Sequence, residues 1–136
     1  MQKIFIVVLL TTALLTASFT YTRQDLALSI KRGKIVYEKN CLACHQVNGA
    51  GVPGINPPLI KTKHVLGDKI KLIQIVIKGF NEEVEINGEF YNNPMPAQVQ
   101  LNDQQVADVL TYVRNSFGNK ATAITIYQVK KERAKK

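Results

Sequence analysis

The pattern of hydrophobic and polar residues predicts a mainly helical protein. Residues 4–15 are apolar apart from two threonines. Further along, periodicity and capping residues predict three helices, at residues 29–40, 68–78 and 102–117. Residues 84–91 differ, because Asn87-Gly88 lies between two short alternating runs, which is typical of a β-hairpin. The chain is therefore expected to be all-α with one small hairpin.

The first predicted helix, residues 29–40, begins with Ser29 as its N-cap. Ile30, Gly33 and Tyr37 recur at helical spacing on one side of this segment. A glycine within a helix costs about 1 kcal/mol relative to alanine. Gly33 is therefore expected to allow another backbone to approach closely, the alternative being a weak helix.

The segment 68–78 is rich in β-branched residues, so its periodicity alone leaves helix and strand open. Its boundaries favour a helix, because Asp68 is a good N-cap and Gly79 suits the position after a helix end.

The segment 102–117 carries the clearest helical pattern. Asn102 and Gln105 form the start of a capping box, and Gly118 is expected to end the helix. The apolar stripe comprises Val106, Val109, Leu110, Val113 and Phe117. Residues 119–136 are assigned to a basic C-terminal tail, in which Thr125 and Gln128 suit another short capped helix and the end is expected to fray.

Residues 1–18 are predicted to be a secretory signal peptide, with a positive start at Lys3, an apolar run and small residues at its end. The run is short for a membrane span, which needs about 20 apolar residues. No clean A-x-A cleavage site is present, so an uncleaved anchor, with membrane association, stays open. Residues 19–28 are assigned to a linker, which leaves 29–118 as one domain.

The formal net charge is +8, and removal of the leader with Lys3 leaves +7. Nucleic-acid binding is not expected, because the lysines are scattered and exported proteins rarely meet nucleic acid. A diffuse positive surface would favour acidic protein partners or an anionic membrane, and the alternative is a merely solvated surface.

The candidate chemistry lies in a C-x-x-C-H motif formed by Cys41, Cys44 and His45, which is typical of c-type haem attachment. Two thiols at this spacing can add to the two vinyl groups of a haem, and the next imidazole can bind the iron. A tetrahedral zinc site is disfavoured, because His64 is the only other histidine and no other cysteine exists. A thioredoxin-like pair would need a βαβ setting that the flanking sequence lacks. A disulfide or another metal site remains the alternative.

The loop after His45 is rich in glycine and proline and is expected to cover the same side of the haem. An iron-bound imidazole usually donates its second ring proton to a neighbouring acceptor, and Pro57 offers a carbonyl for this purpose. The alternative is that Pro57 and Pro58 only fix the loop.

Met95 is the candidate for the opposite side of the iron. It lies between Pro94 and Pro96, and apart from Met1 it is the only methionine. The flanking prolines keep it off any helix face, so it is less suited to the core-filling role usual for methionine. The competitor is His64, which we interpret as a surface histidine because lysines precede it.

As an ordered set, these features resemble class I bacterial cytochromes c, which contain one haem with His/Met ligation. The set comprises Gly33 within a helix, Cys41-x-x-Cys44-His45, Pro57-Pro58-Leu59, Asn93-Pro94-Met95-Pro96-Ala97 and a closing helix with Tyr112. The resemblance covers about residues 29–118 and implies an all-α fold of about four helices around one covalently bound haem c. It also implies that the first and last helices of this region cross near Gly33. The hairpin resembles an insertion in a subset of such cytochromes, often associated with periplasmic dehydrogenases and oxidases.

The resemblance implies electron transfer rather than catalysis. Iron bound by His45 and Met95 has no open position, and the thioether raises the reduction potential relative to bis-histidine ligation. The expected protein is a periplasmic or otherwise exported electron shuttle that exchanges electrons with a dehydrogenase, oxidase or reductase. The alternative is a dedicated cytochrome subunit of a larger periplasmic complex, docked through residues 68–78 and the tail. A haem sensor or enzyme would require that Met95 does not bind the iron.

Overall fold

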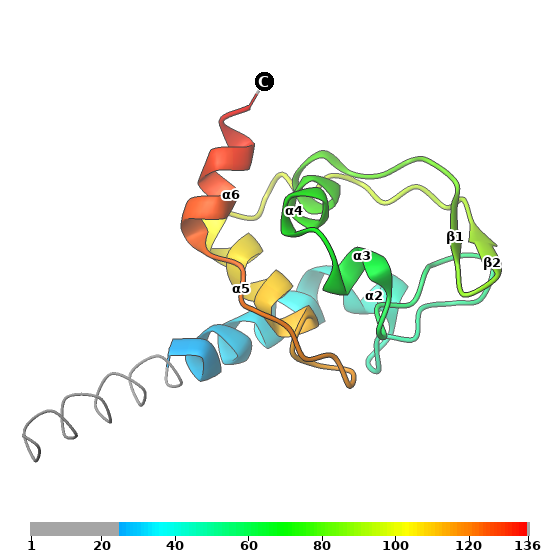
Figure 1. Ribbon diagram of the computed structural model, residues 1–136, viewed down its shortest axis with the longest axis horizontal. Helices are drawn as coiled ribbons and strands as arrows, with labels where there is room; N and C mark the ends of the chain where they lie inside the picture. Colours follow the sequence, from blue (N-terminus) through cyan, green and yellow to red (C-terminus); the bar gives the residue numbers. More distant parts are fainter. Residues whose placement is uncertain (1–24, 136) are drawn as a thin grey trace, which may run out of the picture.

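The computed structural model describes residues 25–135, and helices dominate it (Figure 1). Residues 25–40 are helical. The later elements are α2 (Leu42–His45), α3 (Lys63–Leu66), α4 (Lys69–Lys78), β1 (Val84–Ile86), β2 (Glu89–Tyr91), α5 (Asp103–Val113) and α6 (Ile126–Arg133). The predicted fold class, a helical domain with a small hairpin, is confirmed. The predicted signal peptide and residues 19–24 of the predicted linker lie outside the described residues.

The first helix begins earlier than predicted, because residues 25–28 are helical rather than part of a linker. Ser29 is therefore inside the helix, and its prediction as the N-cap is wrong. The Ser29 hydroxyl instead donates to the Asp108 carboxylate on α5 over 2.6 Å. Arg32 donates to the same buried carboxylate over 2.6 Å. The Ser29 hydroxyl, which could have capped a helix, instead binds a distant helix. The sequence around Ser29 cannot predict such a contact.

The first helix and α5 cross at Gly33, as predicted. A Cβ atom at Gly33 would lie 2.0 Å from the Asp108 carbonyl oxygen and 2.7 Å from Tyr112 Cβ. Only glycine permits this approach of two helices. Beside the crossing, the Tyr37 ring packs against the rings of Tyr112 and Phe117, at centroid distances of 5.4 and 5.3 Å. The crossing fixes the helix that leads into Cys41.

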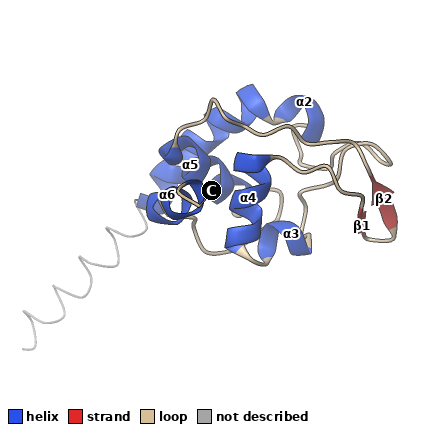
Figure 2. Cartoon of the chain, turned by 90° about the horizontal axis from the view of Figure 1, so that it is seen from above, coloured by secondary structure: helices blue, strands red, loops and turns tan. Residues whose placement is uncertain are grey.

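Both predicted boundaries of α4 are confirmed, because the Asp68 side chain accepts two backbone N–H groups of the first turn and Gly79 follows the last residue. The hairpin is also confirmed, with β1 and β2 antiparallel around Asn87-Gly88. These two residues have φ values of 55° and 82°, as a tight hairpin turn requires. Figure 2 shows the hairpin at the opposite end of the molecule from α6.

The predicted capping box of Asn102 and Gln105 is present at the start of α5, but the helix ends at Val113 instead of Phe117. Phe117 has a φ of 57°, which is incompatible with a helix interior. The early end turns the Phe117 ring into the aromatic cluster. It also lets the buried Arg114 side chain donate to the backbone carbonyl of Thr122 over 2.9 Å.

The short capped helix expected in the C-terminal tail is confirmed as α6, and it packs on the domain instead of extending from it as a separate tail. The capping box of Thr125 and Gln128 is present, and α6 packs against α4 and α5. Val129 is completely buried. Glu132 is also buried, and it accepts hydrogen bonds from Gln74 over 2.9 Å and from Lys135 over 2.6 Å. From the sequence alone a glutamate is expected at the surface. The hydrophobic pattern therefore did not predict that this helix packs on the domain.

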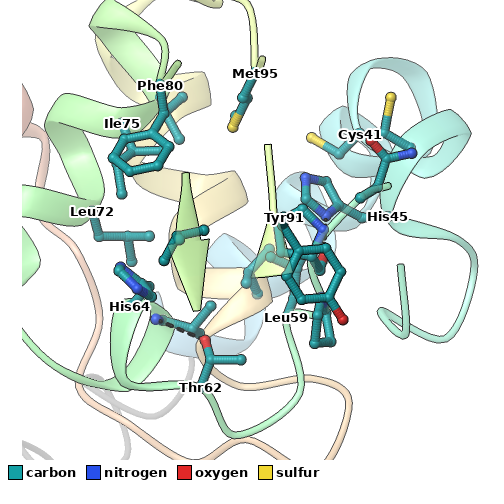
Figure 3. A pocket seen from close by; sticks show the side chains of 18 of the residues that line it. Cys41, His45, Leu59, Thr62, His64, Leu72, Ile75, Phe80, Tyr91 and Met95 are labelled. Atoms are coloured by element: carbon teal, nitrogen blue, oxygen red, sulfur yellow. Dashed lines mark hydrogen bonds between the residues drawn. The ribbon is translucent and has the colours of Figure 1, made fainter. Parts of the chain in front are cut away.

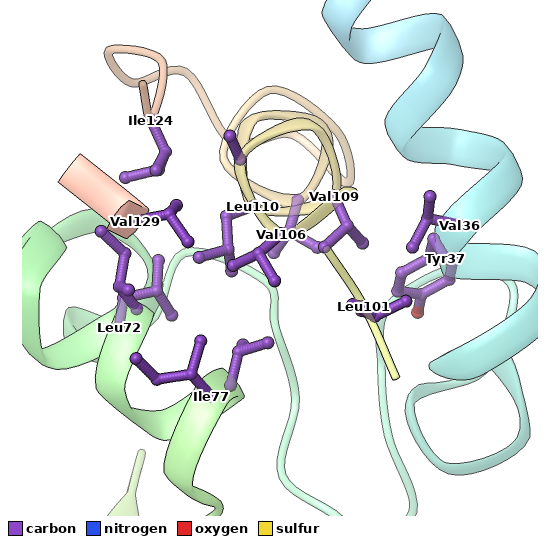
Figure 4. Close-up of a cluster of buried hydrophobic side chains, with 14 of the residues drawn as sticks. Val36, Tyr37, Leu72, Ile77, Leu101, Val106, Val109, Leu110, Ile124 and Val129 are labelled. Atoms are coloured by element: carbon purple, nitrogen blue, oxygen red, sulfur yellow. The ribbon is translucent and has the colours of Figure 1, made fainter. Parts of the chain in front are cut away.

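One hydrophobic core joins these helices (Figure 4). Its members include Val36, Tyr37, Leu72, Ile77, Leu101, Val106, Val109, Leu110, Ile124 and Val129. Helix α4 places Leu72, Ile73, Val76 and Ile77 in this core, and α6 contributes Val129. Ile126 and Tyr127 of α6 are exposed, and the expected docking role of α4 and the tail stays a prediction. Within residues 25–135, every helix is too short or too polar to cross a bilayer.

Candidate haem site

An apolar cavity lies between α4, α5 and the two proline-containing loops (Figure 3). All five predicted site residues line it, namely Cys41, Cys44, His45, Pro57 and Met95. Its apolar wall includes Leu72, Ile75, Val76, Val109, Leu110 and Val113. The sequence did not single out Phe80, Tyr91 or Thr62, which also line the cavity. The fold therefore brings together two thiols, an imidazole and a thioether from segments about 50 residues apart.

The C-x-x-C-H motif forms one helical turn directly after the first helix. The Cys41 amide donates to the Tyr37 carbonyl over 2.9 Å, and the His45 amide donates to the Cys41 carbonyl over 2.9 Å. The Tyr37 hydroxyl reaches past the motif and donates to the Gln46 carbonyl over 2.6 Å. Burial raises the pKa of this phenol well above its usual value, so the hydroxyl keeps its proton and remains a donor. Hydrogen bonds to the buried Tyr37 thus hold Cys41, at the start of the motif, and Gln46, directly after its end.

The His45 ring is oriented by the hydrogen bond that the sequence suggested, because its Nδ1 lies 3.0 Å from the Pro57 carbonyl oxygen. A carbonyl can only accept, so Nδ1 carries the proton and Nε2 keeps its lone pair. Burial lowers the pKa of His45, although the Pro57 carbonyl acts in the opposite direction. The imidazole is therefore neutral at neutral pH, which is the form that binds metal ions.

The loop that carries Pro57 is tied back to the motif. The Gly51 amide donates to the His45 carbonyl over 3.1 Å, and the Leu59 amide donates to the Gly49 carbonyl over 2.8 Å. A Cβ atom on Gly51 would lie 2.2 Å from the Asn56 carbonyl oxygen, and its φ is 68°. The backbone around the Pro57 acceptor is thus closely packed.

The two cysteines are not poised as a redox pair. Burial, and to a smaller extent the neighbouring Cys44, raises the pKa of Cys41 to about 11. Catalytic and redox-active thiols instead have lowered pKa values, because the thiolate is the reactive form. Within residues 25–135, no group of three or more His, Cys, Asp and Glu side chains is arranged to hold a metal ion. Both observations disfavour the thioredoxin-like and zinc alternatives.

Met95 lies on a different segment from His45, and its backbone is paired with Phe80. Its amide donates to the Phe80 carbonyl over 2.7 Å, and the Phe80 amide donates to the Met95 carbonyl over 2.9 Å. Phe80 follows the C-cap of α4, so the end of this helix sets the position of the methionine. Figure 3 shows the Met95 sulfur pointing toward the space that the His45 ring faces.

His64 was expected at the surface, and this is wrong for the Nε2 atom of its ring. His64 lines the same cavity, and its Nε2 is buried without a hydrogen-bond partner among the described residues. Burial is the main cause that lowers its pKa, and Lys63 and Lys71 act in the same direction. The preceding lysines suggested a surface segment. The apolar residue that follows, Val65, is buried, and it was the one sequence feature that indicated a turn packed against the interior.

Comparison with known proteins identifies the family. The family model for cytochrome c matches residues 30–117. The chain belongs to the cytochrome c family. It is 35% identical over 122 residues to cytochrome c-552 of Thermus thermophilus, an alignment that covers 82% of this chain and 80% of the relative. The resemblance to class I c-type cytochromes is thereby confirmed.

Other relatives are parts of larger proteins or complexes. The gluconate 2-dehydrogenase cytochrome c subunit of Pantoea cypripedii is 37% identical over 94 residues, covering 67% of this chain and 21% of the relative. The cbb3-type cytochrome c oxidase subunit CcoP of Azospirillum brasilense is 31% identical over 105 residues, covering 72% and 32%. The relatives thus include a protein named simply as a cytochrome c and proteins named as cytochrome c subunits of enzymes.

Membership of this family means that the protein carries covalently bound haem c and transfers electrons. The residues that line the cavity fit that group. Its walls are mostly apolar, two thiols stand at the attachment spacing, and a neutral imidazole and a thioether are available to iron.

Proposed function

We propose that this cytochrome is an exported carrier of single electrons whose haem is attached through Cys41 and Cys44 and whose iron is bound by His45 and Met95. The observation that carries the proposal is the placement of His45 and Met95 on one apolar cavity, with the His45 ring fixed by Pro57. The potential ligands reach this cavity from two independently supported loops.

The chain's own residues have structural tasks in this function. Bound haem supplies the iron that alternates between the ferric and ferrous states. The Pro57 carbonyl keeps the proton on His45 Nδ1 and so presents Nε2 to the iron. The apolar side chains of α4 and α5 exclude water from the cavity, and the Met95 thioether favours the ferrous state. No side chain has to act as an acid or base.

Replacement of the sulfur ligand tests the proposal most directly. The oxidised native protein should show the weak sulfur-to-iron charge-transfer band near the red edge of the visible spectrum. Met95→Ala should abolish this band, lower the reduction potential substantially and open the iron to small ligands. His64→Ala is the matched control on the same cavity and should keep the band. A native protein without the band, or a band that survives in Met95→Ala, would exclude Met95 as the ligand.

Attachment is tested by extraction. If both thiols form thioethers, haem stays with the polypeptide after denaturation and acidic organic extraction, and Cys44→Ala should weaken this retention. Release of free haem from the native protein would contradict covalent attachment through this motif.

Export is proposed from residues 1–18 and agrees with haem attachment, which in bacteria takes place outside the cytoplasmic membrane. The mature N-terminus should then lie between Ala17 and Gln24, and mass spectrometry of the purified protein would show it. An intact Met1 would instead support an uncleaved anchor.

A second candidate function is that of a dedicated subunit in a larger periplasmic dehydrogenase or oxidase complex. It is favoured by the similarity to cytochrome subunits of such enzymes. In either case we propose redox proteins as partners, and the positive net charge, +7 without residues 1–18, favours acidic ones. Gel filtration of native material separates the two functions, because a subunit would elute with its partners and a shuttle would elute alone.

A further inference from the structure

We propose that His64 is a positioning residue for the haem, and that its Nε2–H donates a hydrogen bond to a propionate carboxylate of the bound haem. This inference rests on the proposed function, because it requires haem attached through Cys41 and Cys44 in the cavity described above.

The first observation is the state of the His64 ring. Among the residues that the structure describes, Nε2 of His64 is the one buried side-chain nitrogen or oxygen without a hydrogen-bond partner. A buried polar atom without a partner lowers stability, because it has lost its hydrogen bonds to water without replacing them. Because His64 lines the haem cavity, the missing partner is expected to be an acceptor on the occupant of that cavity.

The second observation is the place of His64 in the cavity. Figure 3 shows His64 and Thr62 on the side away from Cys41. The vinyl and propionate substituents of a haem are on opposite edges of the porphyrin. Thioether bonds to Cys41 and Cys44 would fix the vinyl edge, so the propionate edge would be directed toward the side where His64 lies.

The third observation is the local charge. Lys63 and Lys71 are close enough to act on His64 electrostatically, so this side of the cavity has a positive potential that suits a carboxylate. Burial and these two lysines also disfavour a second proton on the imidazole. A neutral ring has one N–H, and a carboxylate beside Nε2 would select the tautomer that carries the proton there.

The fourth observation is that hydrogen bonds fix the backbone of the turn that bears His64. The buried Arg114 donates to the carbonyl oxygen of Val65, and the Thr62 hydroxyl oxygen accepts the Val65 amide over 3.3 Å. The Lys61 amide donates to the Asn119 side-chain oxygen over 2.7 Å. These contacts hold both ends of α3, so the imidazole is presented by a fixed backbone, as positioning requires.

The test uses holoprotein with ¹³C-labelled haem propionates and compares the carboxylate stretching bands of native protein, His64→Leu and His64→Gln by infrared difference spectroscopy. His64→Leu should shift one propionate band, because it removes the donor while keeping an apolar side chain. His64→Gln keeps an N–H donor near the same place and should restore the native band position. Identical propionate bands in native protein and His64→Leu would overturn the proposal.

The native protein provides a second readout if His64→Leu does not fold. In reduced, ¹⁵N-histidine-labelled holoprotein, His64 should show a proton on Nε2 that exchanges slowly with solvent. A proton on Nδ1 alone, or rapid exchange at Nε2, would also overturn the proposal.

The same samples separate this inference from the proposed function. Haem retention and the red-edge band report covalent attachment and Met95 ligation, whereas the labelled propionate bands report His64. Loss of the red-edge band in His64→Leu would mean that His64 affects the iron ligands and not only a propionate, which would overturn this inference, while the native band and Met95→Ala would still test Met95.

Discussion

The two sides of the haem cavity are built in different ways. The proximal loop, residues 41–59, is supported mostly by contacts within itself and with the adjacent helix. The His45 ring meets the Pro57 carbonyl only 12 residues later, and the Tyr37 hydroxyl meets the Gln46 carbonyl 9 residues later. The orientation of the His45 ring is therefore determined largely by local sequence.

The distal segment, residues 79–97, depends on the rest of the fold. Met95 is paired with Phe80 at the end of α4, and the hairpin lies between these two partners. The Gln98 amide adds a hydrogen bond to the Val76 carbonyl on α4 over 2.9 Å. The position of Met95 therefore depends on that of α4, which packs against α5 and α6.

This difference predicts different consequences when each side is disturbed. Disturbing the proximal loop should affect the stability of the whole holoprotein, because the proposed attachment residues Cys41 and Cys44 lie there. Disturbing the distal segment should release the sulfur ligand first and leave the haem attached. Glycines with positive φ on the two sides allow this to be tested with one type of substitution.

The largest effect is expected from Gly51→Ala in the proximal loop. The new Cβ would lie 2.2 Å from the Asn56 carbonyl oxygen, and the residue has a φ of 68°. Overpacking and a left-handed backbone together should lower the free energy of unfolding by about 2–5 kcal/mol, measured by denaturant unfolding of the holoprotein.

Gly54→Ala is the matched control in the same loop. Its φ is 67°, but the nearest atom to a new Cβ is 3.9 Å away. Only the left-handed backbone is penalised, at about 1–2 kcal/mol. Equal losses of unfolding free energy in the two variants would show that the proximal loop can adjust to a new Cβ and is not closely packed.

An intermediate effect is expected from Gly79→Ala on the distal side. Its φ is 81°, and the new Cβ would lie 2.8 Å from the Met95 carbonyl oxygen. We expect a loss of about 2–3 kcal/mol in unfolding free energy and a weaker red-edge band, with haem still attached.

Gly88→Ala is the control for this substitution, because its φ is 82° and no atom lies within 4 Å of the added Cβ. It should cost about 1–2 kcal/mol and leave the band unchanged. If Gly88→Ala weakened the band as much as Gly79→Ala does, the Met95 position would depend on the hairpin turn and not on the end of α4.

The smallest effect is expected from Asn93→Ala, which tests whether the two sides are coupled. The Asn93 side chain donates to the Asn56 side-chain oxygen over 2.8 Å at an exposed position. Its loss should cost at most about 1 kcal/mol and leave the band unchanged. A double-mutant cycle with Asn56→Ala measures the coupling, and a value well above 1 kcal/mol would mean that the two sides are not independent.

Features that depend on neighbours in the chain were predictable from the sequence. The Asp68 cap, the capping box of Asn102 and Gln105, and the turn at Asn87-Gly88 each join residues at most three positions apart or require a residue-specific φ. The attachment motif is equally local, and Met95 became the candidate ligand because it is the only methionine apart from Met1.

Features that depend on distant residues were missed or misplaced. Ser29 binds Asp108, 79 positions away, instead of capping its own helix. Glu132 accepts a hydrogen bond from Gln74, 58 positions away, so the short helix expected in the tail packs on the domain, which its own sequence did not indicate. His64 followed two lysines and read as a surface residue, yet its Nε2 faces the haem cavity.

The sequence by itself therefore determined the chemistry of this cytochrome and most of its local structure. Hydrogen bonds within a few residues and the restricted backbone of glycine and proline are properties of short segments. The tertiary structure alone decided which polar groups are buried and what they meet, including the unpartnered His64 nitrogen. Burial depends on the packing of segments far apart in the chain, so no local pattern contains it.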